Sequence, residues 1–521
     1  MIRKVVSLVI CLTMVITMLA GCSNAKNDNT DNGTDKNSVT GTADSNTKDG
    51  NTAEDPYEVV MSFATVADTP ADLQKVEDSI NAISVPEINV KVKLYPISLF
   101  NLSTQANLMI ANNEKLDLLL FINGLGSVSD YVNKGMLLPL DDLVKQYGTD
   151  ITAAEGRAMA GGYIDNVLYS VPSEEKMGRQ YGFGFRTDIL QKYGYDFGDD
   201  VVTYEQLDEM FAKIKAGEGK DFYMLALSSV DTTTYTALNL VDTLGVSSAT
   251  GVLMNGGLDD TTIVDLYETD QYMEHLKWMR KWYLAGYINP DALTLTDDPT
   301  LIQSGKYLGS IHSTEGDSQA TLSQSFGTDV TMVNTTQIIA NTGIYQTSTW
   351  GVPITCENPE ATMKFLNLLY KSEEVVNLIR WGIEGSHYVK TDDPRIIKYP
   401  DGIDRTNTGY NQPMGVFGNK FITYQMVPAT SAYYDNLAAF NAKVTDANSS
   451  KALGYTFNTD NVKTEKAAID SVISQYARTL EYGAVDPDEI LPEFINALKA
   501  AGIDKVVAEN QKALDQWLAN K

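Results

Sequence analysis

The chain has 521 residues and a formal net charge of -28. This acidic balance excludes nucleic-acid binding through a basic groove, and three cysteines are too few for a disulfide framework. The chain begins with Arg3 and Lys4, followed by an apolar run over residues 5–19 that is short for a transmembrane helix. A positive start, an apolar run and then small residues are typical of a signal peptide.

The signal peptide is expected to end at a cysteine. The order Leu19-Ala20-Gly21-Cys22 resembles the bacterial lipobox, in which the cysteine is diacylated and becomes the new N-terminus. The resemblance implies a lipid on Cys22, and two acyl chains are enough for stable anchoring to a membrane. A plain signal peptide with an incidental cysteine is the alternative.

Residues 23–55 are expected to form a disordered tether. They are almost entirely Asn, Asp, Thr, Ser, Gly, Lys and Ala, and they bury too little apolar surface to offset the entropy lost on ordering. A tether behind an acylated cysteine favours the outer face of a Gram-positive cytoplasmic membrane. The remaining body, residues 56–521, exceeds what one hydrophobic core usually supports, so two domains are expected.

The first part of the body predicts a parallel α/β sheet. Residues 116–122 are a nearly continuous apolar run, as in a buried parallel strand, and Gly124 and Gly126 break the chain after it. Strand–helix–strand order predicts right-handed crossovers, with ligands beyond the carboxyl ends of the strands. Strands are expected over 57–63, 88–95 and 116–122, and helices over 70–83 and 99–112.

The middle and end of the body continue this alternation. Strands are expected over 181–186, 222–226, 307–311 and 350–354. Helices are expected over 204–215, 233–244, 270–285, 359–379, 464–478 and 491–519. The sequence holds no metal-ligand spacing, no nucleophile elbow and no phosphate loop, so no cofactor, metal or catalytic residue is assigned.

Several stretches resemble the extracellular solute-binding proteins of ABC importers, in the family 1 cluster that is similar to oligosaccharide-binding proteins. Two stretches near the end resemble LipO-type lipoproteins, which carry a C-terminal module of undefined function. The stretches that carry the resemblance, with a lipobox in front, are residues 135–143 (GMLLPLDDL), 168–172 (LYSVP), 181–190 (YGFGFRTDIL), 282–291 (WYLAGYINPD), 350–354 (WGVPI), 381–388 (WGIEGSHY) and 491–504 (LPEFINALKAAGID).

The resemblance implies a two-lobed periplasmic-binding-protein fold, type II-like, with an interlobe ligand cleft and an extra helical C-terminal region. The solute-binding core would span residues 56–384, and a C-terminal module packed on lobe two would span 385–521. Lobe one would combine about 57–171 with 305–347, and lobe two about 182–304 with 351–384. Hinges would lie near 171–181, near 303–306 and at 349–351.

The resemblance also places candidate ligand contacts at the cleft, where sugars need aromatic platforms flanked by polar groups. Trp350 lies at a predicted crossing strand, where a core tryptophan is an equal alternative. Glu384 lies in a Gly-Ile-Glu-Gly turn, where it would alternatively cap a helix. The full set of candidates is Thr65, Asp68, Glu174, Arg179, Tyr181, Trp350, Trp381, Glu384 and Tyr388.

The expected function is therefore that of a lipid-anchored, monomeric binding protein. It would capture a small solute, an oligosaccharide before others, and deliver it to ABC permease subunits. A binding protein for a peptide or another non-sugar solute stays open as an alternative. So do a surface glycoside hydrolase, which would need a carboxylate pair across a cleft, and an adhesion lipoprotein, since fold does not fix function.

Overall fold

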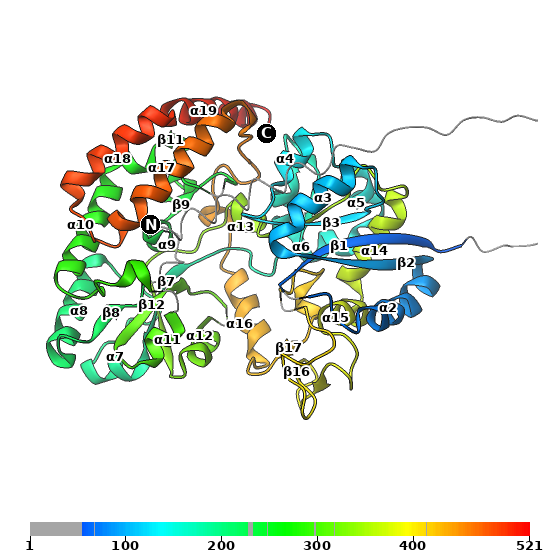
Figure 1. The fold of residues 1–521 in the computed structure, drawn as a ribbon, viewed down its shortest axis with the longest axis horizontal. Coiled ribbons are helices and arrows are strands. Elements are labelled where there is room, and N and C mark those ends of the chain that lie inside the picture. Colours follow the sequence, from blue (N-terminus) through cyan, green and yellow to red (C-terminus); the bar gives the residue numbers. More distant parts are fainter. Residues whose placement is uncertain are drawn as a thin grey trace, which may run out of the picture. The chain divides into compact units, whose positions relative to one another are not determined.

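Two separate sheets organise the body of the protein in the computed structural model (Figure 1). The structure describes residues 55–66, 68–227, 233–246, 248–295, 298–316, 318–412 and 414–521. The expected lipid site at Cys22 and the expected tether up to residue 54 lie outside these residues. Among the described residues, no helix combines the length and the apolarity needed to cross a membrane.

Lobe one is built on a five-stranded sheet of order β2-β1-β3-β14-β6. Strand β1 pairs in parallel with β2 and β3, as expected, whereas β14 runs antiparallel to both β3 and β6. The strands are β1 (Tyr57–Thr65), β2 (Val90–Ser98), β3 (Leu118–Ile122), β6 (Ser170–Pro172) and β14 (Ser348–Gly351). Helices of this lobe are α2 (Leu73–Ile88), α3 (Leu102–Ala111), α4 (Val128–Asn133), α5 (Asp141–Tyr147), α6 (Thr149–Glu155), α14 (Pro359–Lys371) and α15 (Glu373–Trp381).

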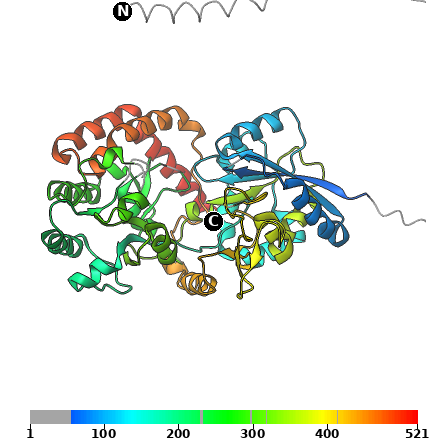
Figure 2. The same ribbon diagram turned by 60° about the horizontal axis from the view of Figure 1, so that its bottom comes forward.

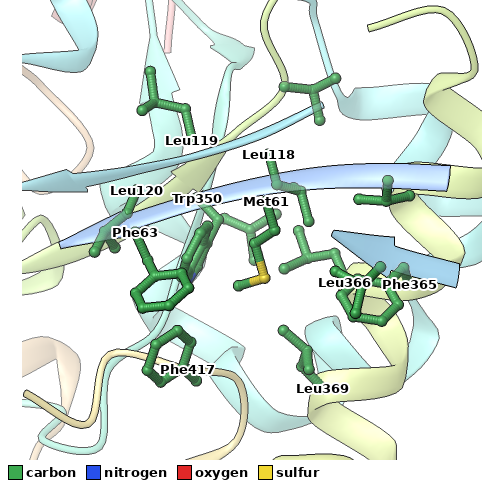
Figure 3. Packing of buried hydrophobic residues seen from close by; sticks show 14 of the residues in the cluster. Met61, Phe63, Leu118, Leu119, Leu120, Trp350, Phe365, Leu366, Leu369 and Phe417 are labelled. Atoms are coloured by element: carbon green, nitrogen blue, oxygen red, sulfur yellow. The ribbon is translucent and has the colours of Figure 1, made fainter. Parts of the chain in front are cut away.

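The core of lobe one lies between this sheet and α14. Most side chains of β1 and β3 are apolar and buried, because helices cover both faces of a mostly parallel sheet. Figure 3 shows Met61, Phe63 and Trp350 packed against Leu366, Leu369 and Phe417. The ring of Phe63 meets that of Phe417 edge to face at 5.4 Å. The predicted helix over 359–379 is thus two helices, because Ser372 ends α14 and caps α15.

Lobe two is built on a four-stranded sheet of order β13-β7-β12-β8. Strand β12 runs antiparallel to β7 and parallel to β8. Its core centres on Phe183 and Phe185, whose rings stack at 4.9 Å, and on the fully buried Trp282. The elements are β7 (Tyr181–Arg186), β8 (Tyr223–Leu225), β12 (Tyr307–Ser313), β13 (Val330–Asn334), α7 (Thr187–Tyr193), α8 (Tyr204–Glu218), α9 (Thr234–Leu238), α10 (Asp270–Leu284), α11 (Asp298–Gln303) and α12 (Ser318–Phe326).

Three C-terminal helices extend the core of lobe two (Figure 1). They are α17 (Lys463–Glu481), α18 (Pro487–Ala501) and α19 (Ile503–Ala519). Their apolar faces share one cluster with α10 and with a small sheet of β9 (Val241–Asp242), β10 (Val252–Met254) and β11 (Ile263–Val264). The predicted single helix over 491–519 is two helices because Gly502, at φ 98°, ends α18 in a left-handed conformation.

Residues 389–426 form a small addition to lobe one. They include a sheet of order β15-β16-β17, whose strands are β15 (Val389–Lys390), β16 (Ile396–Lys398) and β17 (Gln425–Met426). Tyr410, Val416 and Phe417 belong to the core of lobe one. Two short strands, β4 (Tyr163–Ile164) and β5 (Val167–Leu168), form a hairpin ahead of β6.

In the part of the chain that the structure describes, three segments connect the two lobes. They are residues 173–180 between β6 and β7, residues 335–347 between β13 and β14, and residues 427–450, which contain α16 (Ala432–Asn441). A shared cluster that includes Ile339, Tyr345 and Phe440 packs these segments together. Figures 1 and 2 both show α16 lying between the two lobes. The expected hinge over 171–181 thus coincides with the first connection.

The expected lobe assignments of residues 305–347 and 351–384, two of the expected hinges and part of the expected C-terminal module are wrong. Residues 305–347 contribute β12 and β13 to the sheet of lobe two, and α14 and α15 pack in lobe one. The expected hinge at 303–306 is a turn inside lobe two, and 349–351 is a strand inside lobe one. Residues 385–426 pack on lobe one, so the expected module 385–521 is divided between the lobes. Strand patterns predict a strand, but they do not tell which sheet it joins.

Candidate ligand-binding cleft

Two cavities lie side by side between the lobes, with Asn123 in the wall of both. The first has a volume of about 450 Å³ and the second about 500 Å³. Each is lined by residues of lobe one, of lobe two and of the connection 335–347. We refer to the two together as the cleft. Its total volume lies within the range of ordinary small-molecule sites.

Lobe one contributes the turn that follows β3. Asn123 donates its backbone N–H to the carbonyl of Thr347 at 3.2 Å, and Leu125 closes a turn onto Ile122 at 3.0 Å. Gly124 has a φ of 84°, which a residue with a side chain rarely adopts. Residues 123–130 then line the first cavity as α4 begins. The first cavity therefore lies beyond the carboxyl end of the parallel strand β3, where such sheets generally place a site.

The connection 335–347 forms the floor of the cleft. Asn341 caps the short helix α13 (Thr342–Tyr345) by accepting the backbone N–H of Ile344 at 3.0 Å. The side chain of Gln346 donates to the carbonyl of Gly161 and to the hydroxyl of Thr456, which tie the floor to both lobes. These two bonds therefore link the floor of the cleft to lobe one and to lobe two.

Lobe two contributes α9 and the strand region after it. Thr236 and Asn239 line the second cavity together with the buried ring of Tyr267. The carboxylate of Glu481 holds the start of α9 by accepting from the backbone N–H of Thr234 at 2.5 Å and of Tyr235 at 3.1 Å. Burial raises the pKa of Glu481, although these donors oppose the shift.

Three hydrogen-bonded side chains, those of Lys466, Asp470 and Ser248, lie in the same wall. Lys466 donates to the carboxylate of Asp470 at 2.6 Å and to the hydroxyl of Ser248 at 3.1 Å. Ser248 in turn donates to the other oxygen of Asp470 at 2.7 Å. Lys466 and Asp470 line the first cavity, and Ser248 lines the second. The trio therefore stands where the two cavities meet.

Charges in the lining balance. The first cavity has Lys463 and Lys466 against Asp130 and Asp470, and the second has Arg179 against Glu481. Most other polar lining groups are uncharged amides and hydroxyls of Asn, Gln, Ser and Thr. This balance contrasts with the net charge of -28 of the whole chain. A cleft of this kind can hydrogen-bond a polar, uncharged solute.

Two of the residues expected at the site do line the cleft. Arg179 and Tyr181 lie in the wall of the second cavity. The Arg179 backbone pairs with Ile339, and its guanidinium donates to the hydroxyl of Thr347 at 3.4 Å. Burial raises the pKa of Tyr181, so its hydroxyl is a neutral donor and acceptor at neutral pH.

Trp350 does not line the cleft, which corrects the expected platform. Its side chain is 0 % exposed, and its indole N–H donates to the carbonyl of Val416 at 2.9 Å inside the core (Figure 3). Its neighbour Thr349 lines the first cavity instead. Because side chains alternate across a strand, the residue before Trp350 points to the opposite face.

Trp381, Glu384 and Tyr388 lie together, but away from the cleft. The indole N–H of Trp381 donates to Tyr424 at 3.0 Å, and Trp381 and Tyr388 share a small core beside β16. Glu384 is exposed and pairs with Lys390 at 3.7 Å. None of the three is in the wall of either cavity.

Glu174, Thr65 and Asp68 also lie outside the two cavity walls. The Glu174 carboxylate is buried and accepts from the backbone of Glu175 at 3.0 Å and of Lys176 at 3.2 Å, so it shapes the first connection. Thr65 is buried at the end of β1, and Asp68 is exposed in the loop beyond it. Both sit at the carboxyl end of β1 without reaching the cleft.

Several lining residues had no place among the candidates. Asn123 could have been found, because it directly follows a predicted buried strand and precedes a glycine-broken turn. Lys466 and Asp470 gave no such signal, since they sit four apart on a helix far away in the sequence. In the described part of the chain, no group of three His, Cys, Asp or Glu residues is placed to hold a metal ion, and Cys356 is a buried free thiol.

Two lobes, three connections and a polar cleft define a two-lobed solute-binding protein. The family comparison gives the particular group: residues 52–376 match the model of the bacterial extracellular solute-binding proteins, and the chain belongs to this family. Members are binding components of transporters and not enzymes, which confirms the expectation of a binding protein. Residues 451–519 match a second model, described as a domain of unknown function (DUF3502).

Relatives with similar sequences come from Streptococcus pneumoniae. A carbohydrate ABC transporter substrate-binding protein of serotype 4 is 28% identical over 477 residues, covering 89% of this chain and 91% of that protein. The crystal structure of an N-glycan transport solute binding protein, NgtS, is 26% identical with a TM-score of 0.74, covering 89% of this chain and 99% of that one. An oligosaccharide-binding (HMO) protein of Bifidobacterium longum infantis, 16% identical with a TM-score of 0.59, shares the fold; it covers 88% of this chain and 99% of that one.

Proposed function

We propose that the protein captures an oligosaccharide in the cleft and delivers it to the permease of an ABC importer. The observation that carries the proposal is the pair of adjoining cavities between the lobes, whose polar lining groups are mostly hydroxyls and amides. Sugars offer many hydroxyl groups, and such a lining can donate to them and accept from them. The NgtS relative was solved with Man1GlcNAc and with Man5GlcNAc, which supports the same ligand class.

Closure of the lobes would follow from this arrangement. A ligand that contacts residues 123–130 on one side and α9 on the other has more contacts when the lobes are closed than when they are open. It therefore has a higher affinity for the closed state, which is the condition for a ligand to drive a conformational change.

The binding proposal is tested with residues 23–521 by thermal shift and calorimetry. A ligand at 100 times its Kd raises the free energy of unfolding by about 2.7 kcal/mol. We expect Man5GlcNAc or another neutral oligosaccharide to raise the Tm and to be recovered uncleaved. A rise with peptides alone would favour a non-sugar solute, and no rise with any ligand would favour an adhesion role.

Anchoring belongs to the same proposal. We propose that Cys22 carries the lipid that holds the protein at the outer face of the cytoplasmic membrane. Cys22→Ala removes the only attachment point that the lipobox offers, so the variant should leave the membrane fraction. Mass spectrometry of the wild-type N-terminus should show two acyl chains. Retention of the variant on the membrane would contradict the proposal.

We further propose that the body is a monomer, because a cleft that opens and closes needs no partner copy. Multi-angle light scattering of residues 23–521 should give the mass of one chain. A stable dimer at micromolar concentration would be the opposing result.

A further inference from the structure

We propose that the C-terminal module, residues 451–519, is part of the solute site, with α17 forming the wall of the cleft in lobe two and its Lys466–Asp470 pair hydrogen-bonding a neutral solute. The module matches a domain without an assigned function. The inference rests on the proposed binding of oligosaccharide in the cleft. It assigns a role to a segment that lies some 75 residues beyond the part matched by the solute-binding model.

One face of α17 runs along both cavities. Apart from the adjacent Lys466 and Ala467, its lining residues recur every three or four positions, so they form a single stripe on the helix. Four of them line the first cavity: Lys463, Lys466, Ala467 and Asp470. Three line the second cavity: Ile473, Ala477 and Glu481. Eighteen residues of helix rise by about 27 Å. The stripe is long enough to follow an extended solute across the junction of the two cavities.

The module cannot be a loosely attached addition, because it shares its core with the rest of lobe two. Phe494 of α18 is fully buried, and its ring lies 4.7 Å from that of Tyr267, a residue that itself lines the second cavity. On the other side of the core, Tyr476 of α17 stacks on Phe494 at 5.4 Å. The position of α17 is therefore fixed relative to the rest of the cleft wall.

Lys466 and Asp470 have hydrogen-bonding capacity left for a solute. The ammonium of Lys466 has three donors, of which Asp470 and Ser248 take two. The Asp470 carboxylate can accept about four hydrogen bonds, and Lys466 and Ser248 donate two of them. The Asp470 side chain is 41% exposed, so a solute can reach the remaining acceptor positions. A donor and an acceptor held 2.6 Å apart match two neighbouring hydroxyls of a sugar.

The pair also favours an uncharged solute. Since Lys466 and Asp470 cancel each other, the pair attracts neither cations nor anions, and the opposing Lys463 and Asp130 balance in the same cavity. An anionic saccharide would meet the repulsion of a chain with net charge -28 without a cationic pocket to compensate for it.

Glu481 gives the module a second role as a positioning residue. It is the last residue of α17, and its carboxylate accepts from the hydroxyl of Thr233 at 2.5 Å and from the backbone N–H groups at the start of α9. This fixes the direction of α9, whose Thr236 lies in the wall of the second cavity. The module thus also positions α9, the part of this wall that the module does not itself form.

A matched pair of steric variants tests the wall. Ala467 and Ala468 are adjacent and both exposed on α17, but only Ala467 lines the cavity. In residues 23–521, Ala467→Trp should weaken binding of Man5GlcNAc at least tenfold by filling the cleft. Ala468→Trp should change it less than twofold. Equal affinities for the two variants would overturn the inference.

A second pair tests the chemistry. Lys466→Met and Asp470→Asn should each weaken binding about tenfold or more, as expected for a lost hydrogen bond to a charged group. Lys505→Met is the control, because it also removes one positive charge from the module. Lys505 pairs with Glu465 at 2.5 Å outside the cavity walls, so this variant should leave binding unchanged. An unchanged Tm shows that each variant is folded.

The outcomes separate the inference from the proposed function. If wild type binds neutral glycans and Lys466→Met binds them equally well, the inference fails and the proposed function stands. If wild type binds no oligosaccharide, both fail. An alginate oligomer, which is anionic, should bind wild type at least tenfold more weakly than Man5GlcNAc. The reverse order would overturn the preference for a neutral solute.

Discussion

The two walls of the cleft are built in different ways. In lobe one the wall is local: a single strand, β3, ends in a turn, and residues 123–130 supply most of the lining. In lobe two the wall combines α9 and residues 239–246, 248 and 249 with α17, which follows more than 200 residues later. One wall depends on a short stretch of backbone and the other on long-range packing, so the two should respond to different mutations.

The difference suggests how the site can vary. A local wall can change by substitution within one turn, without effect on the core beneath it. A wall held by a shared core changes only if α17 keeps its packing against α10 and β9–β11. We infer that the lobe-two wall sets the frame of the cleft, while the lobe-one turn is free to adjust to it.

The largest expected effect comes from the shared core. Phe494 is fully buried, and Phe494→Ala should lower the free energy of unfolding by about 3–5 kcal/mol. Phe63→Ala should lower it by a similar amount, since Phe63 is equally buried in lobe one. Denaturant titration measures both, and hydrogen exchange shows where each acts.

The two variants should differ in the location of the lost protection. Phe494→Ala should weaken the amides of β9 and β10 together with those of α17–α19, because all belong to one core. Phe63→Ala should leave these amides protected and weaken β1–β3. If Phe494→Ala affects only residues 451–519, the module folds separately, and the contrast between the walls is wrong.

The next effect is a pH dependence that arises from His275 in lobe two. His275 is buried, and its ring bonds to the hydroxyls of Tyr204 at 2.8 Å and Thr234 at 2.9 Å. Burial lowers the pKa of His275 from 6.5 to about 3. Below pH 6.5 the unfolded chain takes up a proton that the folded chain does not. Stability from this group is therefore full above pH 6.5 and is lost as the pH falls toward 3.

In that window the free energy of unfolding falls by about 1.4 kcal/mol for each pH unit. The total loss from His275 at pH 5 is about 2 kcal/mol. Burial raises the pKa of Asp265 to about 6, so this carboxyl acts in the opposite direction as the pH falls. Asp265 is present in both wild type and His275→Gln, so its contribution cancels when the two are compared. The variant should lose less stability than wild type between pH 6.5 and pH 5 in urea titrations; parallel curves would show that His275 titrates normally.

The same contrast explains what the sequence could predict. Strands over 181–186 and 307–311 and helices over 204–215 and 270–285 agree closely with β7, β12, α8 and α10, since apolar periodicity is a local property. The helix expected over 233–244 fails, because α9 ends at Leu238 and the next residues form β9. There, pairing with β10 overrides the local preference.

The candidate site residues differ in the same way: those set by local sequence were predicted, and those set by long-range packing were not. Arg179 and Tyr181 were found because the first connection follows directly from the end of lobe one in the sequence. Trp350 was misplaced because a tryptophan on a strand is compatible with either face, and only the pairing of β14 between β3 and β6 decides. Asp470 depended on the packing of α17, which no local pattern contains.

The smallest effect concerns the lobe-one turn, where two glycines form a matched pair. Gly124 has a φ of 84° with open space around it, so Gly124→Ala meets backbone strain alone and should cost about 1 kcal/mol. Gly126 has an ordinary φ, and an added Cβ would lie 3.5 Å from that of Ser103, a normal contact. Gly126→Ala should therefore stay within about 0.5 kcal/mol of wild type.

Urea denaturation of residues 23–521 measures both variants, and glycan calorimetry shows whether the turn alters the cleft. If Gly124→Ala weakens binding while Gly126→Ala does not, the lobe-one wall depends on one backbone conformation, and the turn is not free to adjust. If both bind like wild type, the turn adapts without cost, and recognition rests mainly on the wall that α17 and α9 form together. The two variants together therefore show whether ligand binding depends on the conformation of the lobe-one turn.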